Sequence, residues 1–146
     1  LVKIEVSNGE IVDKLTILLI KHEKIKDQQK LKNIKKEIEV IGEVSDSIVC
    51  RDSKEFLRLL NINKELWIIE DAIREKERRK EFDDAFIYLA RSVYHNNDER
   101  AKVKRVINDL SESNLFITSL IFPNLDESES LSALRDNIAL PTESNV

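Results

Sequence analysis

Residues 54–80 read KEFLRLLNINKELWIIEDAIREKERRK, and neither glycine nor proline interrupts them. Ser53, directly before this stretch, has a side-chain oxygen suited to capping the start of a helix. At 1.5 Å per residue, a helix over these 27 residues would be roughly 40 Å long. Its apolar stripe comprises Phe56, Leu59, Leu60, Leu66, Trp67, Ile69 and Ile73. Since only another long element can cover such a rod, we predict a long helical hairpin or a dimer.

The composition of the chain also favours an all-α fold. A length of 146 residues is that of a single domain. Two glycines and two prolines are too few turn residues for a many-stranded β fold or for a glycine-rich phosphate loop. Cys50 is the only cysteine, which excludes an internal disulfide and any multi-cysteine metal site. The sequence contains no recognisable cofactor motif, and we expect no cofactor.

Start and stop signals divide the chain into about five helices. Ser7, followed by Glu10, forms a capping box that opens a helix over about residues 8–25. Asp27 can cap a second helix, and Asp83 with the next aspartate opens a fourth after the long stretch above. Residues 94–98, YHNND, have the chemistry of a tight corner before a fifth helix that ends near Leu110. We predict an antiparallel long-helix bundle preceded by a short strand, because residues 2–6 alternate apolar and charged side chains.

The last part of the chain differs from the rest in charge. Residues 123–146 contain five acids and one base, which accounts for the whole net charge of −4. Such a segment is typical of a weakly structured acidic tail. We predict a helical domain over residues 1–112 and a partly flexible or docking extension over residues 113–146. Within that extension, the apolar residues 115–122 are expected to form an extended segment or to dock on a partner.

Partners and location follow from charge and hydropathy. No apolar run approaches the roughly 20 residues that cross a bilayer, and no secretory signal is visible, so we expect a cytoplasmic protein without membrane contact. Residues 21–36 contain seven lysines but no interleaved aromatic side chains, which is typical of a solvated face rather than of nucleic-acid binding. The length of the stretch over residues 54–80 favours a homodimer through the second and third helices.

Positive side chains cluster on both sides of the predicted corner. Arg91 and His95 are four residues apart before it, and Arg100 and Lys104 are four apart after it. A helix beginning at Asn97 would direct free amides into the space between them, as in sites that bind phosphate or carboxylate. The residues that we predict to bind an anion, on a phosphorylated small molecule, a nucleotide, a sugar nucleotide or a protein partner, are Lys14, Arg91, Tyr94, His95, Asn97, Arg100 and Lys104.

Two other interpretations of the polar residues remain open. Glu10 and Asp13 share a helical face, so either can serve as a base, with His95 as an acid, in an enzyme acting on a phosphorylated or glycan-related substrate. Glu70 and Asp71 are weak candidates for a magnesium site with those two carboxylates, although we expect no metal. In the other interpretation the domain is purely an oligomerisation element, and its charged side chains form structural ion pairs.

Three blocks of sequence resemble a known family. They are GEIVDKLTIL (residues 9–18), NKELWIIED (63–71) and ARSVYHNNDER (90–100), followed by Lys104, Ile107 and Asn108. Together they are similar to a family of uncharacterised bacterial proteins, a domain of unknown function sometimes found beside glycan-biosynthesis or repeat-containing proteins. The resemblance covers about residues 2–110 and implies a shared helical fold without a known activity. Because these blocks are rich in charged residues, we expect their polar side chains to meet at one end of the bundle and to satisfy one another or hold a ligand.

Overall fold

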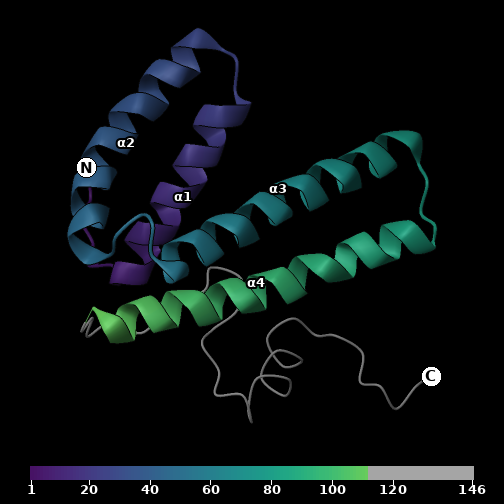
Figure 1. Cartoon of the computed structure of the whole chain (residues 1–146). Helices are drawn as coiled ribbons and strands as arrows, with labels where there is room; N and C mark the ends of the chain where they lie inside the picture. Colours follow the sequence, from purple (N-terminus) through teal and green to yellow (C-terminus); the bar gives the residue numbers. More distant parts are fainter. Residues whose placement is uncertain (112–146) are drawn as a thin grey trace.

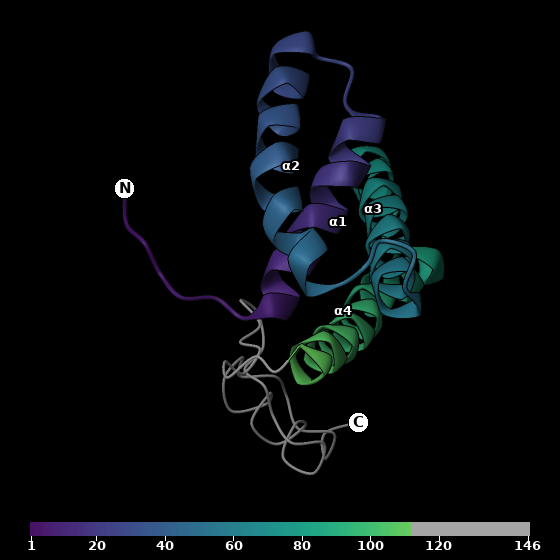
Figure 2. The ribbon, with the colours of Figure 1, turned by 60° about the vertical axis from the view of Figure 1, so that its left-hand side comes forward.

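The computed structural model describes residues 1–111, which form two helical hairpins. The first hairpin consists of α1 (Asn8–Lys24) and α2 (Gln28–Ile48), and the longer second hairpin consists of α3 (Lys54–Arg79) and α4 (Asp84–Leu110). Figure 1 shows the two hairpins diverging from a common corner. α1 packs against each of the other three helices and joins the hairpins, as Figure 2 shows from a second side. The predicted all-α class is confirmed.

Each helix begins where the cap signals predict. The side chains of Ser7, Asp27, Ser53 and Asp83 each accept a hydrogen bond from the backbone amide three residues further on. α3 ends at Arg79 and is capped by Lys80, which adopts the left-handed conformation with φ of 54°. The Lys76 ammonium then bonds the carboxylates of Glu81 and Asp83, so the turn between α3 and α4 is held by its own charges.

The hydrophobic core lies where the two hairpins cross. It is built by α1, the first half of α3 and the last half of α4, and its buried members are Val12, Leu15, Phe56, Leu59, Ile62, Leu66, Val103 and Ile107. Between Trp67 and Lys102 the chain contains no buried residue. The α3–α4 hairpin therefore extends beyond the core as two helices that pack mainly against each other.

The predicted corner at residues 94–98 is wrong. α4 continues from Asp84 to Leu110 without a break, so residues 1–111 contain four helices rather than five. Asn and Asp are poor helix formers, but the penalty is below about 1 kcal/mol per residue and packing along α3 outweighs it. The polar side chains are also accommodated within the helix, since the Asn96 amide donates to the Ser92 carbonyl and Asn97 accepts from Arg100.

The predicted N-terminal strand is also wrong. Residues 1–6 form no strand and lead away from the helices, as Figure 2 shows. Val2 and Ile4 are 91% and 78% exposed, so the alternation of apolar side chains does not correspond to a buried face in residues 1–111. A strand needs a partner to bond its backbone, and the structure places none beside this segment within residues 1–111. The predictions for the segment after residue 111 lie outside the described residues.

Candidate functional site

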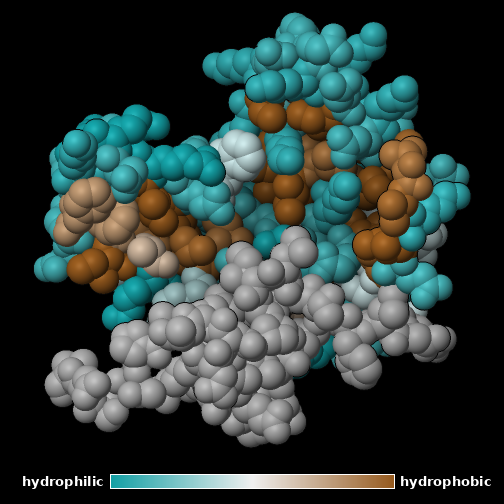
Figure 3. Space-filling view, turned by 180° about the vertical axis from the view of Figure 1, so that it is seen from behind, coloured by the Kyte–Doolittle hydropathy of each residue, from teal (hydrophilic) through white to brown (hydrophobic). Residues whose placement is uncertain are grey.

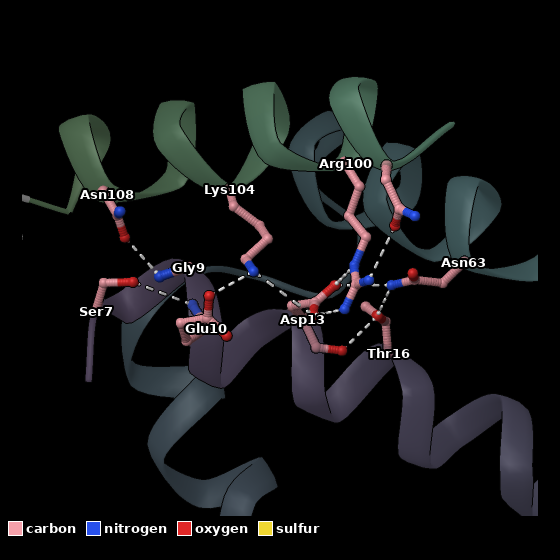
Figure 4. A network of polar contacts seen from close by, with 10 residues as sticks. Ser7, Gly9, Glu10, Asp13, Thr16, Asn63, Arg100, Lys104 and Asn108 are labelled. Atoms are coloured by element: carbon pink, nitrogen blue, oxygen red, sulfur yellow. Dashed lines mark hydrogen bonds and ion pairs between the residues drawn. The ribbon is translucent and has the colours of Figure 1, made fainter. Parts of the chain in front are cut away.

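The charged residues of the sequence blocks meet where α1 crosses α3 and α4. We call this set, Glu10, Asp13, Asn63, Arg100 and Lys104, the polar junction (Figure 4). Its centre is the Asp13 carboxylate, whose side chain is only 4% exposed. The Arg100 guanidinium donates a hydrogen bond to each carboxylate oxygen of Asp13, with Nε 2.8 Å from Oδ1 and Nη2 2.5 Å from Oδ2. Two parallel hydrogen bonds of this kind fix the orientation of both groups.

Further hydrogen bonds complete the environment of Asp13. The Asn63 amide nitrogen donates to Asp13 Oδ1 at 2.9 Å and to the Thr16 hydroxyl at 2.8 Å. The Thr16 hydroxyl in turn donates to the Asp13 backbone carbonyl at 2.7 Å. Asn63 on α3 and Arg100 on α4 therefore both bind the Asp13 carboxylate on α1. This one side chain connects three helices.

Lys104 forms the second ion pair of the polar junction. Its ammonium lies 2.5 Å from Glu10 Oε1 and 3.9 Å from Asp13 Oδ2, while its side chain is 7% exposed. Two carboxylates thus face two cations, and the polar junction is neutral overall. Charges buried in this way are tolerated only when each one is paired and hydrogen-bonded.

Next to this second ion pair, the backbones of α1 and α4 come close together. The Gly9 amide donates to Asn108 Oδ1 at 2.7 Å, which joins the first turn of α1 to α4. A Cβ atom at Gly9 would stand 2.5 Å from the Lys104 carbonyl oxygen. Only glycine permits the two helices to approach this closely.

The electrostatics of the polar junction favour its charged form. Hydrogen bonding to Asp13 raises the pKa of Arg100 above its ordinary value, and the smaller effect of burial acts in the opposite direction. The guanidinium therefore stays protonated throughout the accessible pH range. Chemically, the arrangement joins helices through charge pairs in which every charged group already has a partner.

The structure brings some of the predicted site residues together and separates others. Arg100 and Lys104 meet Glu10 and Asp13, and Asn97 borders them through its hydrogen bond to Arg100. Arg91, Tyr94 and His95 are exposed on α4 away from the polar junction. Because a continuous helix turns about 100° per residue, Arg91 lies about 180° around α4 from Arg100. Lys14 is also exposed and lies 4.0 Å from Glu37 on α2.

The helix end that was expected to supply free amides is absent. Asn97 lies inside α4, so its backbone amide belongs to the helical hydrogen-bond pattern. Tyr94 and His95 instead form a ring contact with centroids 4.2 Å apart on the outer surface. These four basic residues therefore divide into an inner pair, Arg100 and Lys104, bound to carboxylates, and an outer pair, Arg91 and His95, facing away from them.

The weak metal candidates are not assembled into a site. Glu70 and Asp71 both contact Arg74, at 3.2 and 3.6 Å. In the part of the chain that the structure describes, no three His, Cys, Asp or Glu side chains are placed to share a metal ion. Within the same part, no helix is both long enough and apolar enough to span a membrane.

Sequence reasoning missed the uncharged members of the network. Asn63 occupies a position in the buried stripe of α3 between Leu59 and Leu66, where an apolar residue would be expected. A polar residue at a core position is the signal that could have identified it, because a buried amide needs partners. Gly9, in the first turn of α1, is the second signal. Glycine lowers the stability of a helix, so its presence there indicates a position without room for a side chain.

Comparison with known proteins places the chain in a family. Residues 2–126 match the model of a family of unknown function, DUF6165. The match contains all three resembling blocks and continues past residue 110, where the resemblance was expected to end. No curated protein and no solved structure gave a significant match. Since the matched residues make up most of the 146-residue chain, the chain belongs to DUF6165, a family of unknown function.

Proposed function

We propose that this chain is a self-associating helical interaction module. In this proposal the polar junction is a structural clamp that sets the angle between the hairpins. The surface that binds a second copy is the outer part of the α3–α4 hairpin, residues 67–98, which we call the hairpin end. The observation that carries the proposal is the exposure of large apolar side chains on the hairpin end, away from the core.

Several large apolar side chains are exposed on the hairpin end. Ile68, Phe82 and Ile87 are 63%, 57% and 53% exposed, and Tyr88 is 72% exposed. Figure 3, in which the hairpin end lies on the left, shows hydrophobic surface on this part of the molecule as well as nearer its middle. Two helices alone bury only the seam between them, and contiguous exposed apolar surface marks interaction sites. Covering one such side chain fully contributes about 1.5–3 kcal/mol.

A second copy of the chain fits this surface by shape and by charge. Two α3–α4 hairpins packed together would form a four-helix bundle, which is a common arrangement for paired helical hairpins. Residues 67–98 contain eight acids and six bases, so the hairpin end carries only −2 and both signs are interspersed. Two such surfaces repel each other little. Compared with the dimer expected from sequence, the contact would use α3 and α4 rather than the second and third helices, because the hairpin end consists of parts of α3 and α4.

Charged substitutions on the hairpin end test self-association directly. Replacing Phe82 and Ile87 together by lysine should convert a dimer to a monomer, because each copy would bring two charges into an apolar contact. Removing two such anchors is expected to weaken association at least about 100-fold. Light scattering coupled to size-exclusion chromatography measures the mass, and circular dichroism should show unchanged helix content, since both side chains are exposed.

A control substitution separates this effect from a general increase in charge. Val40 on α2 is 63% exposed but lies outside the hairpin end, so Val40→Lys should leave the mass of the dimer unchanged. A wild-type chain that stays monomeric at every concentration tested would overturn the proposed function.

The anion-binding and enzymatic alternatives receive less support from the geometry. A phosphate at Arg100 or Lys104 would have to displace the carboxylates of Asp13 or Glu10, which lie within 2.5 Å of those cations. His95 lies about 140° around α4 from Arg100, so the predicted acid and base do not face a common space.

A titration distinguishes these alternatives from the clamp. Calorimetric titration with phosphate, nucleotides or nucleotide sugars should produce no binding heat, because both cations are occupied. Saturable heat that disappears in Arg100→Ala, with the fold retained, would instead support anion recognition.

A further inference from the structure

We propose that two copies pair in antiparallel orientation along α4, about a two-fold axis between Tyr94 and His95, with Arg91 of each copy against Asp98 of the other. This inference rests on the proposed function, because it requires a second copy of the chain. It places the contact on the α4 face of the hairpin end and on the turns of α4 that follow it, so that the two hairpin ends point in opposite directions. In this arrangement Arg91 and Asp98 determine which surface is bound and in which orientation.

The proposed contact is a continuous stripe on α4. Ile87, Arg91, Tyr94 and Asp98 follow one another at spacings of four, three and four residues. At about 100° per residue, these positions fall within an arc of roughly 60°. Ile87 is 53% exposed and Tyr94 is 38% exposed, and the two charged residues are exposed as well. Alternating spacings of three and four residues form the seam along which two helices pack.

The charges on this stripe are self-complementary in one orientation only. Arg91 and Asp98 are seven residues apart and therefore occupy equivalent positions two turns apart along the helix. A two-fold axis midway between them places Arg91 opposite Asp98 of the second copy, and the symmetric pair forms at the same time. A parallel arrangement in register would place arginine against arginine and aspartate against aspartate. The order of charges thus favours the antiparallel pair and disfavours the parallel one.

The same two residues lack an ion-pair partner in residues 1–111. Glu99, next to Asp98, pairs with both Arg58 and Lys102. Asp98 has no cation within ion-pair distance in that range. Partial burial raises the pKa of its carboxyl above the ordinary value, and the weaker effects of nearby His95 and Lys102 act in the opposite direction. A partly desolvated carboxylate and an arginine on one exposed stripe are suited to pair across an interface.

Charge reversal gives a test that depends on the symmetry. In the full-length chain, Arg91→Glu alone would place two carboxylates together at both contacts, and Asp98→Arg alone would place two guanidinium groups together at both. Each variant alone should therefore dimerise at least about tenfold more weakly than wild type. Mixed in equal amounts, the two variants should form a heterodimer, because both contacts then join opposite charges. Sedimentation velocity and native mass spectrometry, which separates the masses of the two variants, measure both results.

The outcomes separate this inference from the proposed function. If each variant alone dimerises like wild type, the contact lies elsewhere, so the antiparallel α4 pair is wrong while self-association stands. Loss of the dimer in both variants without recovery in the mixture would also overturn the antiparallel arrangement. A monomeric wild-type chain would overturn both proposals. Lys36→Glu, an exposed charge reversal on α2, serves as the matched control and should leave the dimer unchanged.

Discussion

Asp13→Ala is expected to destabilise the fold by about 3–5 kcal/mol, the usual cost of removing one partner from a buried ion pair. Without this carboxylate, the Arg100 guanidinium loses both of its charged hydrogen bonds, and the Asn63 amide loses an acceptor. Lys104 keeps Glu10 but loses the second nearby carboxylate. Since the same carboxylate ties α1 to α3 and α4, its removal weakens the crossing of the two hairpins.

Urea unfolding followed by circular dichroism measures this loss as a lower midpoint. Lys14→Ala is the matched control, because Lys14 is adjacent in sequence but exposed and lies 4.0 Å from Glu37. A surface ion pair of that kind contributes about 0–1 kcal/mol, so the control should unfold close to wild type. Equal midpoints for the two variants would contradict the assignment of the polar junction as a structural clamp.

The second large effect is expected for Gly9→Ala, which should cost about 1–3 kcal/mol. The added Cβ would stand 2.5 Å from the Lys104 carbonyl oxygen, a backbone atom that cannot rotate away. The first turn of α1 must then separate from α4, and the hydrogen bond from the Gly9 amide to Asn108 is lost or lengthened. Overpacking of this kind costs typically about 1–3 kcal/mol, and the lost hydrogen bond adds about 1 kcal/mol, while the better helix propensity of alanine returns about 1 kcal/mol.

The second glycine provides the control for this experiment. A Cβ at Gly42 would stand 2.9 Å from Arg51 Nη2, which is the end of a flexible side chain that is 43% exposed. Arg51 can move aside, so Gly42→Ala should be neutral or stabilising by up to about 1 kcal/mol through helix propensity. Thermal unfolding of both variants gives the comparison. A Gly9→Ala chain that is as stable as Gly42→Ala would exclude a close backbone approach at α1 and α4.

The helices and their starting points were determined locally. Ser7, Asp27, Ser53 and Asp83 cap their helices because a short polar side chain can bond the free amides of the next turn in any context. The apolar spacing over residues 54–80 likewise predicted a long helix, and α3 covers Lys54–Arg79. Local chemistry also identified Glu10 and Asp13 as carboxylates on one face of α1.

Only the tertiary structure decided which cations meet those carboxylates. Residues 94–98 have the chemistry of a turn, but packing against α3 makes them part of one continuous helix. Because each residue of a helix is rotated about 100° from the last, that continuity turns Arg100 toward α1 and Arg91 away from it. The partners of a buried charge depend on how distant helices cross, and that angle results from the packing of Phe56, Val12 and the rest of the core rather than from any local signal.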